Sequence, residues 1–518
     1  MGNYNFDDLQ YLQIPLPEEL LKLKWHGSFT RMKRIIDAKL ANDIPIALKR
    51  FPDIRNEIKY YAITDNLIKS REFFILKYFS ELYPDKPPLY FWLIRFFKEN
   101  FESFNFLSIF FGSVIPSFII VILMYHLFTK LKSEKFGFLV AVSLATTPFF
   151  MGISVFLRMD MLMNLFITIS LYYFFSIYFN LIKNSWANRV ILYLSIFLGI
   201  FTKGIAGGMV PLSIILGFLT LEKNLTFLKK INFLAGLGLI LFCALAWFSF
   251  IYLQPEGKEY LALMFKQETV GRIVKAKTHI RPFYYYFVRL NFLIFPYSLF
   301  WYCGVFHYLK DIKNYRSWNY LEKIGVIWSI VPLVLFSLAS GKLDIYMLPL
   351  FTGMILLSLN FFIKIKNKKI GKGLLKIISI ILIIPFFINR FSKNRENQYK
   401  KFLTIPLSIV IIFGVLAQGM RVFNRHFTLT PIVFQIQDNR KIYTYRFEDF
   451  KNIEGVEPKI KDSNITNIQE LEKMKEILKT DNSKNYLMIK SKYNEKFNDV
   501  KNLKLKFTNN SYSIFERE

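Results

Sequence analysis

The sequence has few of the residues that disulfide, metal or nucleotide chemistry requires. Only two cysteines, Cys243 and Cys303, occur among 518 residues, and both lie inside apolar stretches. They exclude a disulfide scaffold and indicate no thiol metal site. The 5 His are not paired at ligand spacing, and neither a P-loop nor a dinucleotide-binding fingerprint occurs. ATP-driven pumping and haem or zinc chemistry therefore have no support. No cofactor is expected, although the sequence leaves a divalent metal open.

Charged residues are also scarce, at 20% of the chain, whereas 53% of the residues are hydrophobic and 18% are aromatic. A block of about 18 or more apolar residues spans a bilayer as a helix, because lipid offers no partner to unpaired backbone groups. Such blocks cover residues 106–128, 136–157, 161–182, 231–253 and 402–420. Shorter or end-charged blocks cover residues 190–202, 204–221, 291–309, 324–340, 345–363 and 377–389. We therefore expect an all-α polytopic membrane protein with about eleven transmembrane helices.

The net charge of +30 is compatible with nucleic-acid binding, but a polytopic chain favours another interpretation. Basic residues of such proteins collect in cytoplasmic loops and pair with anionic lipid headgroups. We expect membrane lipids as partners and no nucleic acid.

The polar residues divide the chain into three zones. Residues 1–105 form a polar, basic N-terminal region, residues 106–420 a membrane body, and residues 421–518 a polar tail. The tail combines strand-like runs with one helical run, which predicts a small C-terminal α/β domain. The strand-like runs are 441–446 and 486–489, and the helical run is 468–478.

Short Lys-rich loops alternate with the other loops along the membrane body. They are residues 130–135, 183–189, 222–230, 310–323 and 364–372. If these loops are cytoplasmic, the opposite face carries the other polar clusters. Those clusters are residues 1–105, 158–160, Lys203, 254–289 and 340–344. Charged residues that converge at helix ends on one face are usually functional, and the alternative is that each is an interfacial anchor.

The stretch RMDMLMNLF places Asp160 at the start of a helix, two residues after Arg158. A carboxylate near a helix N-terminus is favoured by the helix dipole, which suits a base or an electrostatic anchor, although capping alone also explains it. In YPDKPPLYFW, two prolines predict an extended segment followed by a helix. This corner is expected to present Tyr83 and Lys86 to a charged headgroup, with Trp92 as an interfacial anchor.

Two further outer stretches are rich in cations and tyrosine. Residues 266–281 include Arg272 and His279, and their pattern predicts an amphipathic segment. Such a segment would form either a lipid-phosphate pocket or a surface for general adhesion to anionic lipid. In SGKLDIYMLPLF, Lys342 and Tyr346 are four residues apart, a spacing that predicts a shared helical face. Lysine would supply charge and tyrosine a neutral donor to a phosphate oxygen.

Five stretches in order resemble a known family. They are ELYPDKPPLYFWL, RMDMLMNLFITISLYYF, LGIFTKGIAGGMVPL, ETVGRIVKAKTHIRPFYYYF and ASGKLDIYMLPLF. The family is the GT-C class of bacterial membrane glycosyltransferases related to lipid A aminoarabinose transferase and dolichyl-phosphate-mannose protein mannosyltransferases. The resemblance implies an inverting enzyme of the bacterial inner membrane. It would move a sugar from a polyprenyl-phosphate carrier to a lipid, glycan or protein acceptor at the outer face.

The resemblance also implies roles for individual residues. The family's outer acidic pair falls on Asn56 and Glu57, followed by Lys59 as a lipid-phosphate ligand. Because an amide accepts no proton, either Glu57 or Asp53 takes the catalytic role, or the chain is inactive. Asp160 matches the second acidic position. The positions implicated in phosphate binding match Tyr83, Lys86, Arg272, Lys342 and Tyr346, and His279 lies in the matching outer segment.

Two other functions stay open at this stage. A lipid-linked sugar transporter also needs an anion site, but it predicts polar residues along a path between both faces. An inactive homologue that only binds polyprenyl phosphate is consistent with Asn56 and with residues 29–51, which are too charged for the family's first membrane helix. No secretory signal follows Met1, and an altered start would explain both departures.

Overall fold

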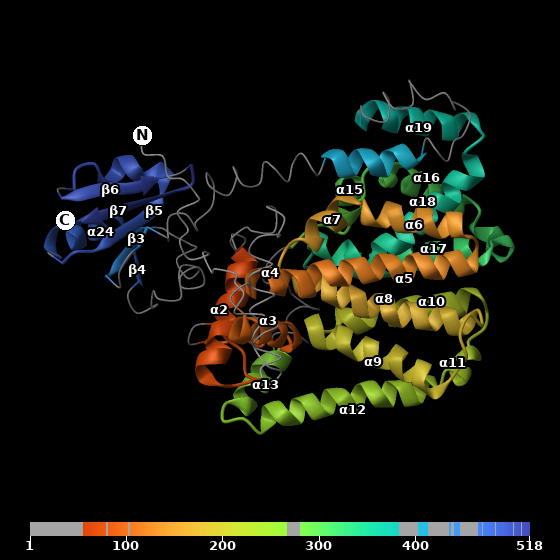
Figure 1. Ribbon diagram of the computed structural model, residues 1–518, viewed down its shortest axis with the longest axis horizontal. Helices are drawn as coiled ribbons and strands as arrows, with labels where there is room; N and C mark the ends of the chain where they lie inside the picture. Colours follow the sequence, from red (N-terminus) through yellow and green to blue (C-terminus); the bar gives the residue numbers. More distant parts are fainter. Residues whose placement is uncertain are drawn as a thin grey trace, which may run out of the picture. The chain divides into compact units, whose positions relative to one another are not determined.

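The computed structural model describes much of the chain and divides it into two compact units. It describes residues 55–78, 81–101, 104–266, 280–382, 402–412, 435–436, 440–445, 465–468, 470–481, 483–500, 502–508 and 510–517. The membrane unit comprises Arg71–Tyr90 and Ile109–Val415, and the second unit comprises Met1–Ser70, Phe91–Ser108 and Leu416–Glu518. Most of the described elements are helices (Figure 1).

The membrane unit is a bundle of helices with a small hairpin, β1 (Lys77–Tyr78) and β2 (Glu81–Leu82), at its start. Its α- and π-helices are η5 (Phe110–Val114), α5 (Ile115–Leu131), α6 (Glu134–Ala145), α7 (Pro148–Ser154), α8 (Met159–Tyr178), α9 (Trp186–Lys203), α10 (Ala206–Leu221), α11 (Phe227–Lys230), α12 (Phe233–Tyr252), α13 (Gly257–Phe265), α15 (Tyr285–Leu293), α16 (Tyr297–Lys310), α17 (Tyr320–Leu338), α18 (Phe351–Ile365) and α19 (Lys369–Leu382). It also contains two 3-10 helices, η7 (Ile312–Ser317) and η8 (Asp344–Leu350), and a shorter apolar helix, Phe402–Ile412.

Among the described residues, five helices are long and apolar enough to span a membrane, or six if one bent pair counts as a span. The five are Phe104–Leu131, Met159–Tyr178, Phe233–Tyr252, Tyr320–Leu338 and Asp344–Ile365. The chain is therefore a multi-pass membrane protein. The expected number of eleven stays a prediction, and the blocks 377–389 and 402–420 extend beyond the described residues.

The core of the bundle lies around α8 and α18. Within an apolar stretch of 18 residues in each span, 94% of the residues are buried in Asp344–Ile365 and 72% in α8, but only 17% in α12. Figure 1 shows α12 at the edge of the bundle, with α9 between it and α8. An apolar helix that is exposed in this way presents its side chains to lipid. The polar residues that start α8 are consequently placed beside the most protected part of the bundle.

One expected span is bent. The block 136–157 predicts a single helix, but α6 and α7 meet at 66°. Thr147 between them is extended, with φ −63° and ψ 122°, and Pro148 begins α7. A proline disfavours helical backbone in the residue before it, so this sequence breaks the span at Thr147.

The second unit contains α2 (Arg55–Ser70), most of α3 (Leu89–Asn100), α4 (Phe104–Ile109) up to Ser108 and the C-terminal strands. Helices α2 and α3 are joined by charged and aromatic contacts. Lys98 Nζ lies 2.5 Å from Asp65 Oδ1, and the rings of Tyr60 and Phe91 meet edge to face at 5.6 Å between centroids. These contacts hold α2 in a defined orientation against α3.

The C-terminal strands form one five-stranded sheet in the order β4-β3-β5-β7-β6. The strands are β3 (Ile442–Tyr445), β4 (Ile465–Ile468), β5 (Tyr486–Lys490), β6 (Leu503–Thr508) and β7 (Tyr512–Arg517). Strand β3 runs parallel to β4 and β5, and β7 runs antiparallel to β5 and β6. A hydrophobic core lies against this sheet. Helix α24 (Leu471–Thr480) contributes Met474 and Leu478 to the core, and η11 (Ser491–Phe497) contributes Phe497. The boundaries 1–105, 106–420 and 421–518 stay predictions.

Candidate active site

A buried charge cluster lies where α8 begins. The Asp160 carboxylate is fully buried. Arg158 Nε donates to Asp160 Oδ2 at 3.1 Å, and Lys203 Nζ donates to Oδ1. A buried carboxylate is stable only when it is paired and hydrogen-bonded, and both of its oxygens are bonded here. Its place in the first turn of α8 adds the favourable helix dipole.

Local backbone features bring these three residues together. Helix α9 ends at Lys203 because Gly204 follows with φ 98°, a left-handed conformation that favours glycine. On the other side of the cluster, Ser113 Oγ donates to the carbonyl oxygens of Phe156 at 2.6 Å and Arg158 at 3.4 Å. Ser113 belongs to the π-helical turn η5, a feature that often marks functional sites. These two bonds fix the segment before Asp160 to η5.

Helices α9 and α10 also approach closely through glycine. A Cβ atom on Gly207 of α10 would lie 2.2 Å from the carbonyl oxygen of Gly199 in α9. Small residues allow helix backbones in a membrane to meet at such distances. The stretch LGIFTKGIAGGM therefore folds into a tight helical turn with Lys203 at its tip.

Tyr346 joins the cluster from the 3-10 helix η8. The Lys203 ammonium lies 5.0 Å from the centroid of the Tyr346 ring, and that ring stacks against Phe336 at 5.8 Å. A cation over an aromatic face is attracted by the ring quadrupole. The cluster thus combines residues from α8, α9 and η8.

Lys342 has a different role from the one its spacing to Tyr346 suggests. The prediction that both residues share a helical face is wrong, because η8 begins only at Asp344. Gly341 pairs with Ile280 in a β-bridge, which keeps the backbone before η8 extended. Lys342 is buried, and its Nζ donates to the carbonyl oxygen of Arg281 at 3.1 Å and to that of Ala339. Burial lowers the pKa of the Lys342 ammonium.

The corner YPDKPPLYFW is held by the hairpin before it and by α13. Lys86 Nζ donates to the carbonyl oxygen of Asp85 at 2.8 Å, and Tyr260 of α13 donates to the carbonyl oxygen of Tyr83 at 3.1 Å. Lys77 of β1 pairs with Glu256, next to α13, at 2.6 Å. Helix α3 begins at Leu89, directly after the two prolines, which confirms the expected helix. The residues before it form a turn and bends, so the expected extended segment stays a prediction.

The remaining expected site residues are placed as follows. Glu57 and Lys59 lie on α2 in the second unit, and Glu57 is fully buried. Asp53, Arg272 and His279 lie outside the described residues. Within the membrane unit the structure brings Asp160 and Tyr346 together through Lys203. Sequence reasoning placed Lys203 on the outer face without a role, although a lysine between an apolar block and a glycine was a usable signal.

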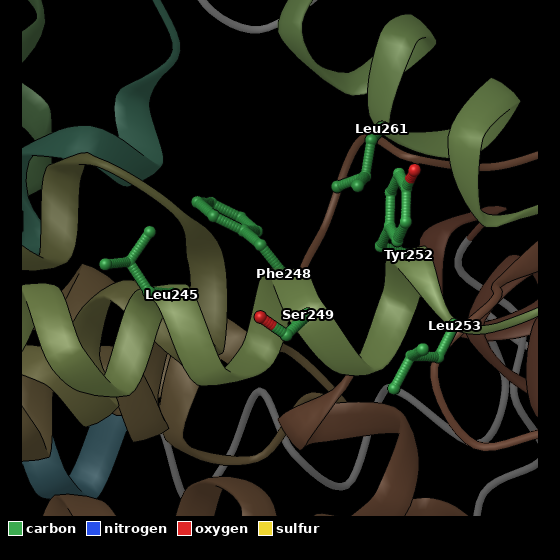
Figure 2. Close-up of a pocket in the computed structure, with 6 residues that line it drawn as sticks. All are labelled: Leu245, Phe248, Ser249, Tyr252, Leu253 and Leu261. Atoms are coloured by element: carbon green, nitrogen blue, oxygen red, sulfur yellow. The ribbon is translucent and has the colours of Figure 1, made fainter.

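No described metal-binding group coincides with this cluster, and one described groove is lined by other residues. In the described part of the chain, no group of three or more His, Cys, Asp or Glu residues could hold a metal ion. A groove of about 410 Å³ lies on α12 and α13. Figure 2 shows the residues that line it, Leu245, Phe248, Ser249, Tyr252, Leu253 and Leu261. Its lining suits hydrocarbon and offers two hydroxyl groups, so group transfer is better supported at the charged cluster. The expectation of no cofactor stays a prediction.

Comparison with known proteins connects this fold to membrane glycosyltransferases. Residues 85–250 match the family model "Dolichyl-phosphate-mannose-protein mannosyltransferase". The crystal structure of ArnT from Cupriavidus metallidurans bound to undecaprenyl phosphate has a TM-score of 0.69. The alignment covers 94% of this chain and 97% of that chain, at 11% sequence identity, and so shows the common fold. The protein thus has the GT-C fold of polytopic membrane transferases.

Sequence relatives point in the same direction. An uncharacterized protein of Aquifex aeolicus is 25% identical over 69% of this chain and 68% of its own length. An undecaprenyl phosphate-alpha-4-amino-4-deoxy-L-arabinose arabinosyl transferase of Photorhabdus laumondii is 26% identical over 70% of this chain and 65% of its own length. The chain spans about two thirds of each relative. It is similar in sequence and fold to the GT-C glycosyltransferases of the aminoarabinose transferase and protein mannosyltransferase family.

Proposed function

We propose that the protein is a glycosyltransferase that moves a sugar from a polyprenyl-phosphate carrier to a lipid acceptor at the outer face of the inner membrane. The observation that carries this proposal is the cluster of Asp160, Arg158, Lys203 and Tyr346 at the buried start of α8. The GT-C fold and the relatives named for undecaprenyl-phosphate substrates support it. Buried charges inside a membrane protein are costly and mark functional sites.

The proposed reaction inverts the anomeric carbon in one displacement. The acceptor oxygen forms a bond to the anomeric carbon and gives its proton to a carboxylate. The bond from that carbon to the phosphate oxygen breaks, and polyprenyl phosphate leaves with the electron pair. Negative charge therefore grows on the phosphate, and preorganised cations lower the barrier where that charge develops. No nucleotide is needed, because the activated bond arrives with the lipid.

The bonds of Asp160 favour an electrostatic role over a role as proton acceptor. Lys203 and Arg158 bond its two oxygens, so an approaching hydroxyl would have to compete with two cations. We assign Asp160 to hold Lys203 beside Tyr346. The resemblance to the family assigns the proton acceptor to Glu57, and we keep that role for it. Glu57 is fully buried in the first turn of α2, where a carboxylate is favoured, and a positioned base typically contributes about 10²- to 10⁴-fold in rate.

The test is transfer from a radiolabelled polyprenyl-phosphate-sugar pool in membranes that carry matched amounts of each variant. Wild type should transfer label to lipid, and Glu57→Gln should lose about 10²-fold or more of the rate. Glu222→Gln serves as a control, because its pair with Lys323 at 2.9 Å lies at the opposite end of α17 from Ser340. A wild type that binds the carrier lipid but releases no sugar would instead support the inactive homologue.

A further inference from the structure

A second polar network ties α15 to the turn before η8. Arg289 Nε lies 3.0 Å from each oxygen of the Asp344 carboxylate, and a terminal nitrogen of Arg289 also donates to Oδ2. Tyr285 donates its hydroxyl proton to Asp344 Oδ1 at 2.8 Å. An arginine that bonds a carboxylate through two nitrogens fixes orientation as well as distance.

Backbone contacts extend this network over the neighbouring residues. The Tyr286 hydroxyl accepts from the amide of Leu343 at 3.2 Å and lies 3.3 Å from the carbonyl oxygen of the same residue. The bridge between Ile280 and Gly341 and the bonds from Lys342 continue the contact. We call the contact between residues 280–289 and residues 339–344 the outer clasp.

The outer clasp acts on the residue that lies beside Lys203. Asp344 is the first residue of η8, and Tyr346 follows two positions later in the same short helix. A side chain on η8 moves with that helix, so the bonds to Asp344 determine where the Tyr346 ring lies. The Lys203 ammonium, 5.0 Å from that ring, is in turn bonded to Asp160. A continuous set of contacts therefore joins α15 to the charge cluster.

We propose that Arg289 and Asp344 are positioning residues for the carrier-phosphate site and act through Tyr346 and Lys203. The proposal rests on the proposed transferase function and adds to it two residues that would not touch the reacting atoms. Stability alone is a poor explanation of the pair, since the Arg289 side chain is 41% exposed and partly exposed ion pairs contribute little to folding.

The test compares Arg289→Gln, Asp344→Asn and the charge-swapped double variant Arg289→Asp with Asp344→Arg. Glu222→Gln, which breaks an ion pair at the other end of α17, is the matched control. For each purified full-length protein we would measure KM and kcat for the polyprenyl-phosphate-sugar, the Kd for polyprenyl phosphate alone, and the thermal midpoint in detergent.

We expect each single variant to raise KM and the carrier Kd about tenfold, the change that about 1.4 kcal/mol of lost binding produces. The thermal midpoint should stay close to that of the control. The kcat should fall as well, because a displaced Lys203 stabilises the developing phosphate charge less. The swapped pair should recover most of the affinity. Equal KM and Kd in the clasp variants and the control would overturn the positioning role, as would a loss of affinity that follows the thermal midpoint.

The two proposals fail in distinguishable ways. If wild type is active and the clasp variants keep the KM and Kd of the control, only the positioning role of the outer clasp is refuted. A wild type that binds polyprenyl phosphate but transfers no sugar refutes the transferase function. The Kd values of the variants then test the positioning role of the outer clasp by themselves. A wild type that neither binds nor transfers overturns both.

Discussion

Replacing Lys203 by methionine is the sharpest test of the charge cluster. The change keeps the length of the side chain and removes the ammonium that bonds Asp160. Because Asp160 is fully buried, losing a partner leaves its charge undercompensated. Breaking a buried ion pair from one side costs roughly 3–5 kcal/mol. Arg158 still bonds the other oxygen, so we expect a loss at the lower end, about 3 kcal/mol.

The measurement is the free energy of unfolding of the full-length protein in mixed micelles, with the transfer rate as a second readout. Adding Asp160→Asn to Lys203→Met removes the buried negative charge, and stability should return to within about 1 kcal/mol of wild type. The transfer rate should stay about 10²- to 10³-fold low in both variants, because the cation beside the phosphate is still missing.

Lys323→Met provides the control for loss of a lysine ion pair. Its partner Glu222 is 23% exposed, so water can solvate the carboxylate that remains. Such pairs contribute about 0–1 kcal/mol, and we expect a change in that range. If Lys203→Met unfolds like this control, the argument that Asp160 depends on Lys203 is refuted.

The remaining predictions concern helix packing and acid stability. Gly207→Ala should destabilise the protein by about 1–3 kcal/mol and reduce transfer, because the new Cβ meets the Gly199 backbone. Gly238→Ala, with no atom within 4 Å of its Cβ, is the control, and equal unfolding free energies would contradict the close helix approach. Hydrogen bonds from Ser483 are the largest cause of the lowered pKa of Asp481, about 2. The ionised Asp481 therefore stabilises the folded state above the usual aspartate pKa, and this stabilisation is lost as pH falls towards 2. We expect hydrogen exchange of the β5 amides to become faster over that pH range in wild type. In Asp481→Asn, the rate should no longer depend on pH in this way. An unchanged acid profile in this variant would exclude the assignment.

Individual residues show how far sequence reasoning reached into the fold. The blocks 106–128, 161–182 and 231–253 correspond to observed candidate spans. Such spans can be predicted because the thickness of the bilayer sets the length of an apolar helix, and that length is visible in the sequence. The bend at Thr147 followed from a local signal too, the proline after it, which the apolar pattern of the block concealed. Lys342 was misplaced because its four-residue spacing to Tyr346 says nothing of the bridge between Gly341 and Ile280.

The site shows the same division between local and distant information. A carboxylate at the start of α8 and cations on the same expected face were predictable from the residues around each one. The partner of Asp160 was not, since Lys203 is 43 residues away and meets it only after α8 and α9 have packed. Arg289 and Asp344 are 55 residues apart, and the sequence placed both on one expected face without predicting a contact between them.

The sequence by itself indicated a polytopic membrane protein that resembles the GT-C glycosyltransferases, and it predicted an anion-binding outer face. The length of apolar blocks, the charge of loops and the order of motifs are properties of the sequence that do not depend on tertiary contacts. Only the tertiary structure decided that Lys203 bonds Asp160, that Lys342 joins two outer segments and that Arg289 holds the start of η8. Ion pairs depend on side-chain positions to within about an ångström, and helix packing sets those positions.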